Sequence, residues 1–382
     1  VTATRPGYPT AKADSISTKV APGTLKASRP PAISGTPQVD SDLTASPGTW
    51  SKPDLTYAYQ WMRDGVPVQG ATSSTFAPGP ADAKHHVTVT VTASETGYTP
   101  ATSTSAPTAE VALGVLSGVT KPAISGTAKV GSALAASPGT WSKPDLTYTY
   151  QWHANGTDIA GATGKSFTPT SRERGSKVGV RVFVHKDGYE TNSALSDDTA
   201  EVGYGTIESQ KAPAITGSLR VGSTLSASAG TFAPADTTVK YQWLRDGKVQ
   251  SGATGRTRKI PASDRGHKLS VQVHYAAPGY TTRTVTTAST GVVKTTSKLS
   301  VTVTPGTRRV SFKISATATG VAAPSGTIDV AMPGPNRTIK LVKGRATLTL
   351  TKQATGSRVY VFTLRGTSSM TSAKSRNTVK IR

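Results

Sequence analysis

The sequence contains no cysteine, and this absence removes a whole class of chemistry. Disulfide bridges, thiolate metal sites and cysteine nucleophiles all require a thiol, so none of them is available to the chain. Apolar runs are also short, and none approaches the roughly 18 residues that a membrane-spanning helix needs. A stable core must therefore come from packing alone.

Acidic residues are scarce: 21 Asp and Glu stand against 44 Lys and Arg, which gives a net charge of +23. The imbalance is uneven, because residues 297–382 hold fifteen basic residues and a single acid, Asp329, and so carry +14. A field of this sign favours anionic partners: wall polymers, acidic polysaccharide, lipid headgroups or nucleic acid. The competing explanation is solubility, because net charge governs non-specific association rather than fold.

Helical stripes of apolar residues are missing, whereas alternation with a period of two is frequent. Val87, Val89 and Val91 alternate with threonine, and the same pattern returns around Val180 and Val271. Such alternation places branched side chains on one face of a half-buried strand. The sequence therefore predicts an all-β protein with many short strands.

A unit of 91 residues is repeated along the chain, since Trp61, Trp152 and Trp243 are each 91 residues apart. The stretch GTWSKPDLTYAYQW at 48–61 returns at 139–152 with a single change, and as GTFAPADTTVKYQW at 230–243. The opening residues VTATRPGY align with VTASETGY at 91–98. We therefore expect three full copies, preceded by the end of an earlier copy, in a piece of a longer polypeptide.

Each copy contains the signals of a β-sandwich. Asp64-Gly65, Asn155-Gly156 and Asp246-Gly247 follow the tryptophan strand and supply the positive φ angles of a tight hairpin. About seven short strands, each bounded by Gly or Pro, fit a sandwich of ordinary size.

The copies resemble the bacterial immunoglobulin-like (Ig-like) repeats of secreted and surface proteins, especially those of actinobacteria. The resemblance rests on P-A-I-S-G, V-G-S-x-L, P-G-T-W, Y-x-Y-Q-W, D-G, G-A-T, D-x-G-x-x-L and G-Y, and covers residues 29–293 and 1–20. It implies tandem Ig-like β-sandwich domains in an elongated array at the cell surface or outside the cell. It also implies that Trp61, Trp152 and Trp243 pack between the two sheets. Residues 297–382 look like a second type of bacterial Ig-like domain.

These patterns divide the chain into five segments. We expect the C-terminal remnant of a preceding repeat at 1–24, Ig-like repeats at 25–114, 115–205 and 206–295, and a basic Ig-like domain of a different type at 296–382. Leu43, Leu134 and Leu225 are expected to fill the core where antibody domains place cysteines. At the corner that reads Glu173-Arg174-Gly175 in the second copy, the first copy has Asp82-Ala83-Lys84, which leaves its geometry open.

No metal, cofactor or catalytic site is predicted. The histidines are scattered, only His85 and His267 share a position in the repeat, and we expect them to be surface residues. One recurring aspartate per copy is no calcium loop, which gathers about six to eight oxygens, so we interpret it as a turn residue that bonds its own backbone. A nucleophile elbow and phosphate-binding loops are absent, which argues against an enzyme. The recurring aspartates are Asp54, Asp145 and Asp236.

Aromatic residues decide whether the repeats carry a sugar platform. Trp50 and Trp141 are replaced by Phe232 in the third copy, as a packing position allows, so all five tryptophans are interpreted as core. Few rings then remain for stacking on a sugar, and in the repeats these are Phe183, Tyr204 and Tyr275.

The leading hypothesis is a monomeric, non-catalytic spacer and binding array of a longer secreted or surface protein. Its basic terminal domain would attach to an anionic cell-wall polymer or polysaccharide, and specific binding of nucleic acid is not expected because few rings accompany the charge. One alternative is the accessory region of a secreted hydrolase with its catalytic domain upstream. Another is an adhesin that recognises protein or glycan through loops such as Val66–Gln69, Thr157–Ala160 and Lys248–Ser251. The candidate residues for anionic binding are Arg308, Arg309, Lys340, Lys343, Arg345, Lys380 and Arg382.

Overall fold

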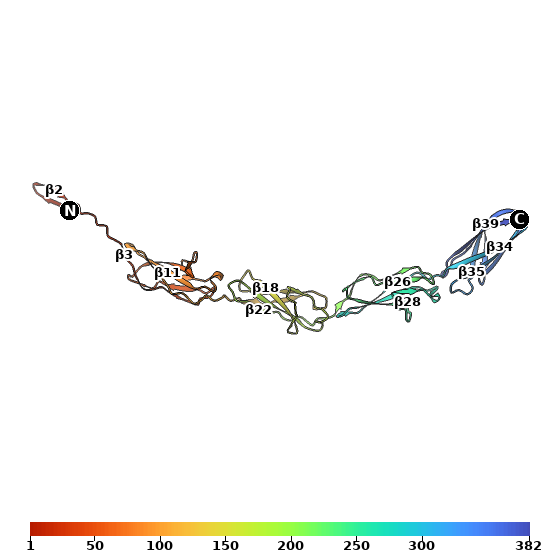
Figure 1. Ribbon diagram of the computed structural model, residues 1–382, viewed down its shortest axis with the longest axis horizontal. Helices are drawn as coiled ribbons and strands as arrows, with labels where there is room; N and C mark the ends of the chain where they lie inside the picture. Colours follow the sequence, from red (N-terminus) through yellow and green to blue (C-terminus); the bar gives the residue numbers. More distant parts are fainter. The chain divides into compact units, whose positions relative to one another are not determined.

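The computed structural model describes residues 1–382, and their regular structure is almost entirely β-strand (Figure 1). The only helical turns are two short 3-10 segments, η1 (Pro80–Asp82) and η2 (Ala262–Asp264). The expected all-β class is therefore confirmed. The chain forms two compact units, which we describe separately: unit 1 comprises residues 1–127, 133–167 and 176–201, and unit 2 comprises residues 128–132, 168–175 and 202–382.

Unit 1 begins with an exposed hairpin of β1 (Thr2–Arg5) and β2 (Tyr8–Lys12). Its first sandwich packs a three-stranded sheet, in the order β10-β6-β5, against a four-stranded sheet, in the order β13-β11-β8-β9. Two short pairs, β4 with β7 and β12 with β3, complete it. The bounds are β3 (Gly23–Thr24), β4 (Ala27–Arg29), β5 (Ala32–Ser34), β6 (Leu43–Ser46), β7 (Thr49–Trp50), β8 (Thr56–Arg63), β9 (Val66–Pro67), β10 (Thr75–Phe76), β11 (Val87–Ser94), β12 (Tyr98–Thr99) and β13 (Ala101–Thr104).

The second copy in unit 1 repeats this arrangement, with sheets in the order β15-β16-β20 and β19-β18-β21-β22 and with β14 paired to β17. The bounds are β14 (Gly118–Thr120), β15 (Ala123–Ser125), β16 (Leu134–Ser137), β17 (Thr140–Trp141), β18 (Thr147–Ala154), β19 (Thr157–Asp158), β20 (Ser166–Phe167), β21 (Val178–His185) and β22 (Asn192–Leu195).

Unit 2 contains the third copy, with sheets β25-β26-β30 and β29-β28-β31-β33, and the pairs β24 with β27 and β23 with β32. It also contains the C-terminal sandwich, built from sheets β34-β35-β38 and β37-β36-β39-β40. The bounds are β23 (Gly205–Thr206), β24 (Glu208–Lys211), β25 (Ala214–Gly217), β26 (Thr224–Ser228), β27 (Thr231–Ala233), β28 (Thr238–Arg245), β29 (Lys248–Val249), β30 (Thr257–Lys259), β31 (Leu269–Ala276), β32 (Tyr280–Thr281), β33 (Arg283–Thr286), β34 (Ser297–Gly306), β35 (Arg309–Ala318), β36 (Gly326–Ala331), β37 (Arg337–Leu341), β38 (Arg345–Leu350), β39 (Gly356–Leu364) and β40 (Ala373–Ile381).

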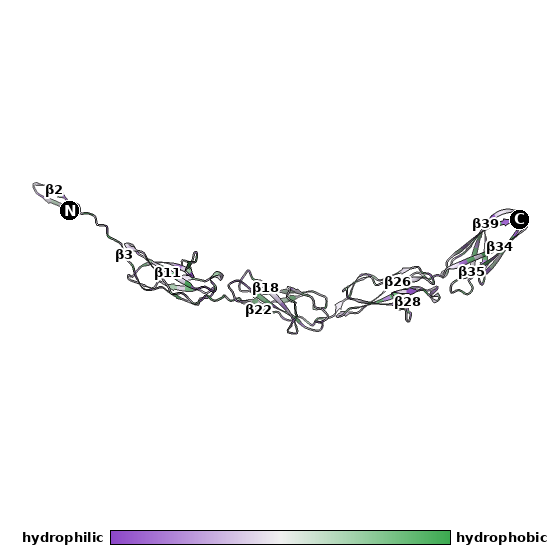
Figure 2. Ribbon diagram, in the orientation of Figure 1, coloured by the Kyte–Doolittle hydropathy of each residue, from purple (hydrophilic) through white to green (hydrophobic).

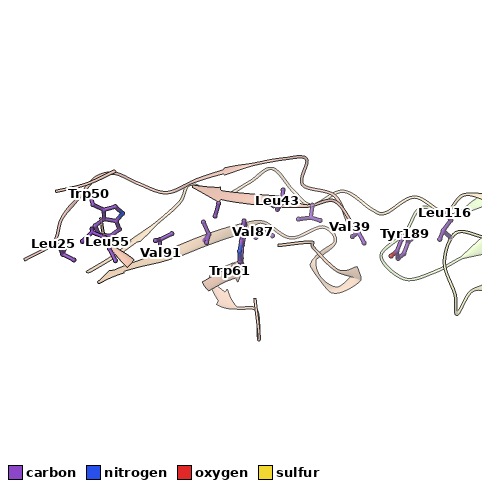
Figure 3. Close-up of a cluster of buried hydrophobic side chains, with 14 of the residues drawn as sticks. Leu25, Val39, Leu43, Trp50, Leu55, Trp61, Val87, Val91, Leu116 and Tyr189 are labelled. Carbon is purple, nitrogen blue, oxygen red and sulfur yellow. The ribbon is translucent and has the colours of Figure 1, made fainter. Parts of the chain in front are cut away.

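The predicted alternation sets the two faces of the central strands. Along β11 the valines at 87, 89 and 91 are fully buried, whereas the intervening threonines are partly exposed. Strand β8 pairs with β11 over its whole length and brings Trp61 to the same inner face, where it is fully buried (Figure 3). The Trp61 indole Nε1 donates a hydrogen bond of 2.9 Å to the Ser73 carbonyl, so its polar atom is satisfied inside the core.

The other predicted core residues behave in the same way. Trp152 and Trp243 are fully buried, and the leucines expected at the antibody cysteine positions are also 0% exposed. Packing of these side chains replaces the missing crosslink, and burial of a large apolar side chain contributes about 1.5–3 kcal/mol. The leucines are Leu43, Leu134 and Leu225.

In the C-terminal sandwich, strand β39 has apolar residues on both faces. Tyr360, Phe362 and Leu364 are its fully buried set, and Val361 on the opposite parity is half-exposed. Phe312 of β35 packs against the rings of both Tyr360 and Phe362 at 4.9 Å between centroids. Apolar colour in Figure 2 accordingly lies along the strands of this sandwich.

Turn residues largely follow the prediction. Asp64, Asn155 and Asp246 have φ between +46° and +49°, and the following glycines have φ near +80°, as in a tight hairpin. Lys84 has φ +66°, close to Gly175 and Gly266 at the equivalent corner, so the first copy keeps that geometry with a side chain in place of glycine.

The recurring aspartates had been interpreted as turn residues whose side chains bond their own backbone, and this interpretation was wrong. Asp54 and Asp145 have positive φ values of 58° and 56°, but no side-chain hydrogen bond to their own backbone. Asp236 in the third copy does not share the positive φ. Asp54 and Asp145 therefore serve the turn through the left-handed conformation that short polar residues tolerate.

Candidate functional site

The C-terminal sandwich carries its positive charge almost without neutralisation. Its single acid, Asp329, accepts two hydrogen bonds from Arg365, at 2.8 Å from Nε and 2.7 Å from Nη2. This guanidinium holds the pKa of the Asp329 carboxyl below its ordinary value, so the carboxylate is committed to Arg365. None of the other fourteen basic residues of 297–382 has a carboxylate partner within 4.0 Å.

The structure divides the predicted anion-binding residues between opposite ends of this sandwich. Arg309 begins β35, whereas Arg345 pairs with Ser315 six residues further along that strand. At about 3.3 Å per residue the two positions are roughly 20 Å apart. The first group is Arg308, Arg309, Lys380 and Arg382, near the turn after β34; the second is Lys340, Lys343 and Arg345, near the turn before β38.

Backbone hydrogen bonds hold each end together. The Arg308 N–H donates to the Arg382 carbonyl at 2.8 Å, and the Gln353 N–H donates to the Arg308 carbonyl at 2.9 Å. At the other end the Lys343 N–H donates to the Ser325 hydroxyl oxygen at 3.2 Å. Ser325 precedes β36, which confirms that Lys343 lies away from Arg308.

The sequence prediction did not include three further basic residues of this sandwich. Lys352 lines a hollow of about 550 Å³ together with Thr307, Arg308, Arg309 and Thr351. Lys374 and Arg376 are exposed at alternate positions of β40, in line with Lys380. Alternation between charged and small polar residues in KSRNTVK was the signal that could have found this outward face.

No stacking platform accompanies this charge. Phe312, Tyr360 and Phe362, the rings of the basic domain, are all buried. Without exposed rings the domain lacks the base-stacking surface that single-stranded nucleic acid uses.

A second candidate region lies at the junction of the two copies in unit 1. The Tyr189 hydroxyl donates a 2.6 Å hydrogen bond to Asp40 Oδ2, and Lys143 Nζ lies 2.8 Å from the same oxygen. Lys143 and Tyr189 lower the pKa of the Asp40 carboxyl. Burial, with the hydrogen bond to Asp40, raises the pKa of Tyr189 to about 12. Figure 3 shows Tyr189 extending the buried cluster of Val39 and Leu43 towards Leu116.

Main-chain pairing reinforces this junction. Gly114 donates from its N–H to the Gly188 carbonyl and accepts from the Glu190 N–H, both at 2.9 Å. Beside the junction lies a hollow of about 780 Å³ with charged groups of both signs on its walls. These are Lys84, Asp145, His185, Lys186 and Asp187.

The equivalent junction in unit 2 keeps the backbone pairing but not the polar contacts. The Gly205 N–H donates to the Gly279 carbonyl at 3.0 Å, and β23 pairs with β32. The Tyr280 ring packs against Gly131, which stands where Asp40 stands in the first copy. The residues that replace His185, Lys186 and Asp187 are Ala276, Ala277 and Pro278.

The prediction that all the histidines are surface residues was wrong for one of them. His153 is 9% exposed, and neither of its ring nitrogens has a hydrogen-bond partner. It lies opposite Gly179 in β21, and a Cβ on Gly179 would collide with the imidazole and with Asp198. The scattered positions of the histidines had suggested surface residues, but the chain around Asp198 lies close to the imidazole of His153.

Two other histidines form hydrogen bonds to carboxylates that spacing did not predict. His85 Nδ1 donates to Asp64 Oδ2 at 2.6 Å, and His267 makes the same contact with Asp246 in the third copy. His85 and the His86 N–H lower the pKa of the Asp64 carboxyl. These pairs join the hairpin turn to the segment before the next strand, and they include no third metal-ligating side chain.

The rings left for sugar stacking are fewer than expected. Tyr275 is 2% exposed, and its hydroxyl donates to the Ala229 carbonyl at 2.7 Å. The prediction that its ring is available for stacking on a sugar was therefore wrong. Tyr204 is 52% exposed, with the Arg174 guanidinium 4.7 Å from its ring centre. Trp50 and Trp141 are buried as predicted.

Comparison with known proteins gives one sequence relative. The chain is 28% identical over 253 residues to the "Highly immunogenic outer capsid protein" of Enterobacteria phage T4. The match covers 64% of this chain and 66% of the relative, so the chain spans slightly less than two thirds of that protein. No family model matches the chain.

Similar solved structures are also Ig-type arrays. The ectodomain fragment D1–D4 of ICAM-5 aligns with 92% of this chain and 99% of its own, at 12% identity and a TM-score of 0.32. Three N-terminal domains of the highly immunogenic outer capsid protein (Hoc) of bacteriophage RB49 align with 69% of this chain and 98% of their own, at 15% identity and a TM-score of 0.26. The chain is built of tandem Ig-like β-sandwiches, and none of its helical turns has the length or apolar character to cross a bilayer.

Proposed function

We propose that this chain is a non-catalytic spacer and binding array on an exposed surface of a cell or virion, and that its basic C-terminal domain attaches it to an anionic polymer. The observation that carries the proposal is the set of fourteen basic side chains without a carboxylate partner, in a domain whose one acid is bound to Arg365. Such a surface attracts polyanions over a distance of several ångströms.

The remaining parts of the proposal follow from the repeats. The segments 25–114, 115–205 and 206–295 act as monomeric spacer domains, with 296–382 as the attachment domain and 1–24 as the end of a preceding repeat. Their resemblance to actinobacterial surface repeats supports a cell-wall polymer or polysaccharide as the partner. The name of the phage relative, an outer capsid protein, supports display on an exposed surface.

Sedimentation with isolated cell walls tests this function. The full chain is expected to sediment at about 0.05 M salt and to be released at about 0.5 M, because the Debye length shrinks from more than 10 Å to about 4 Å. Deletion of 297–382 is expected to abolish sedimentation. Equal sedimentation with and without these residues would refute the attachment role.

The hollow at the unit 1 junction favours a second candidate, recognition of a glycan or protein by the repeats. Its charged walls are specific to this junction, because Ala277 and Pro278 replace Lys186 and Asp187 in the third copy. On a glycan array, K186A/D187A is expected to lose any ligand that the repeats bind without residues 297–382, while substitutions at Ala277 leave that binding unchanged. Retention of that ligand by K186A/D187A would reject the hollow as its site.

A further inference from the structure

Residues with positive φ differ in kind between the repeats and the C-terminal sandwich. Among the non-glycine residues with positive φ, the repeats have six Asp or Asn and Lys84. The C-terminal sandwich has three, and all are basic: Arg308 at +47°, Lys343 at +45° and Lys352 at +55°. Asn, Asp or Gly would adopt this conformation at lower energy. The sandwich therefore keeps long cationic side chains where the backbone favours other residues.

Two of these residues come together at one end of the sandwich. Arg308 belongs to the two-residue turn between the paired residues Gly306 and Arg309. Lys352 belongs to the loop that joins β38 to β39, and the Gln353 N–H ties that loop to the Arg308 carbonyl at 2.9 Å. We name this end the tip and define it as the five residues that line the 550 Å³ hollow: Thr307, Arg308, Arg309, Thr351 and Lys352.

The five residues of the tip present hydrogen-bond donors and no side-chain carboxylate. It has two guanidinium groups, one ammonium group and two hydroxyls, all on exposed residues, and none of the three cations forms an ion pair. We propose that the tip is a binding site for a tetrahedral oxyanion, a phosphate or sulfate group carried on a polymer. This inference rests on the proposed function and assigns the attachment to five residues.

The arrangement of the donors favours a tetrahedral anion over a carboxylate. A carboxylate has two oxygens that lie in one plane, and a bidentate guanidinium engages both of them from that plane. Here the donors come from two separate turns and from the start of β35, so they approach from different directions. A phosphate or sulfate group has oxygens outside a single plane and can accept from all of them.

The experiment is a titration of the full chain with inorganic phosphate, followed by the backbone amide signals of the tip in NMR spectra. The double variant R308N/K352N removes two charges and places Asn where the backbone favours it. It is expected to bind phosphate at least about tenfold more weakly, equivalent to the loss of about one charge-assisted hydrogen bond. Its melting temperature is expected to equal or exceed that of the unmodified chain.

The control variant is K343N, which makes the same backbone change at the opposite end of the sandwich. It is expected to leave phosphate binding unchanged. Equal weakening by K343N and by R308N/K352N would overturn the proposal, because the effect would then be one of total charge. Absence of phosphate binding, or acetate binding as strong as phosphate binding, would also overturn it.

Binding to three polymers distinguishes phosphate from sulfate as the source of the anion. It also distinguishes failure of the tip as a site from failure of the attachment role. Polyphosphate, dextran sulfate and polygalacturonate present phosphate, sulfate and carboxylate respectively, and the tip is expected to retain one of the first two more strongly than the third. If R308N/K352N binds them as the unmodified chain does, while removal of 297–382 abolishes binding, the tip is wrong and the attachment role stands. If the tip binds phosphate but the chain binds no wall, the attachment role fails and the tip stands.

Discussion

The hydroxyl of Tyr189 donates a hydrogen bond to Asp40, a residue 149 positions earlier in the chain. The contact connects two copies of the repeat within unit 1, and Lys143 completes it by its ion pair with the same carboxylate oxygen. At the equivalent position in unit 2, Tyr280 packs against Gly131, which has no carboxylate. The two junctions can therefore be compared to measure what the hydrogen bond contributes.

Replacement of Tyr189 by phenylalanine is expected to weaken the junction. The ring still packs, but the hydrogen bond to a charged acceptor is lost, which costs about 1–2 kcal/mol. Hydrogen exchange of the Gly114 and Glu190 amides, which take part in the junction pairing, measures this loss. The matched variant Y280F removes a hydroxyl with no side-chain partner. It should leave hydrogen exchange of the Gly205 amide, in the equivalent junction, unchanged. Equal effects in both variants would assign the loss to packing.

The same contact makes the junction sensitive to pH at both extremes. The pKa of Asp40 is lowered, so its contribution is present above its unfolded value near 3.8 and is lost as pH falls through the lower folded value. The pKa of Tyr189 is raised to about 12, so its contribution is complete below its unfolded value near 10 and is lost as pH rises towards 12. Burial also raises the pKa of Tyr150, Tyr275 and Tyr360, so ultraviolet absorbance of tyrosinate should show several late-titrating tyrosines, and one fewer in Y189F.

Replacement of Lys84 by glycine is expected to stabilise the first repeat. A lysine at φ +66° is strained, and relief of that strain is worth up to about 1 kcal/mol after the entropy cost of glycine. The reverse change, Gly175→Ala, tests the same conformation, because a Cβ there has open space and meets only the backbone cost. Urea unfolding should move the two midpoints in opposite directions, and a stabilised G175A would contradict the explanation.

Replacement of Trp61 by alanine is expected to cost about 4 kcal/mol, because a large buried ring is lost and the Ser73 carbonyl loses its donor. Urea unfolding followed by the remaining tryptophans measures the effect. If the tryptophans were sugar platforms instead, W61A would unfold normally and lose glycan binding. Soluble wall glycans are accordingly expected to leave tryptophan fluorescence unchanged.

Sequence patterns predicted the features that depend on neighbouring residues. Alternation at Val87–Val91 gave the inner face of β11, and Asp64-Gly65 gave its hairpin turn. The Asp40–Tyr189 contact was not predictable, because it depends on how two copies pack. The prediction that His153 is a surface residue was wrong for a similar reason, since scattered positions in the sequence do not reveal which segment packs over a strand.

The candidate site was predictable in composition but not in arrangement. A count of charges found Arg308 and Arg345 together, yet strand direction separates them by the length of β35. Lys352 was overlooked because its loop reaches the Arg308 turn only through the pairing of β38 with β35 in the same sheet, and these strands are far apart in the sequence.

The fit between His153 and Gly179 bears on how neighbouring copies avoid exchanging strands during folding. Strands β8 and β18 share five of their eight residues, so during synthesis β18 could pair wrongly with β11 of the first copy. In that hybrid His153 would face Thr88, whose Cβ would occupy the space that Gly179 leaves for the imidazole. The bulky side chain and the glycine opposite it are thus expected to favour the correct partner, and aggregation of a G179T variant on refolding would report the loss of that preference.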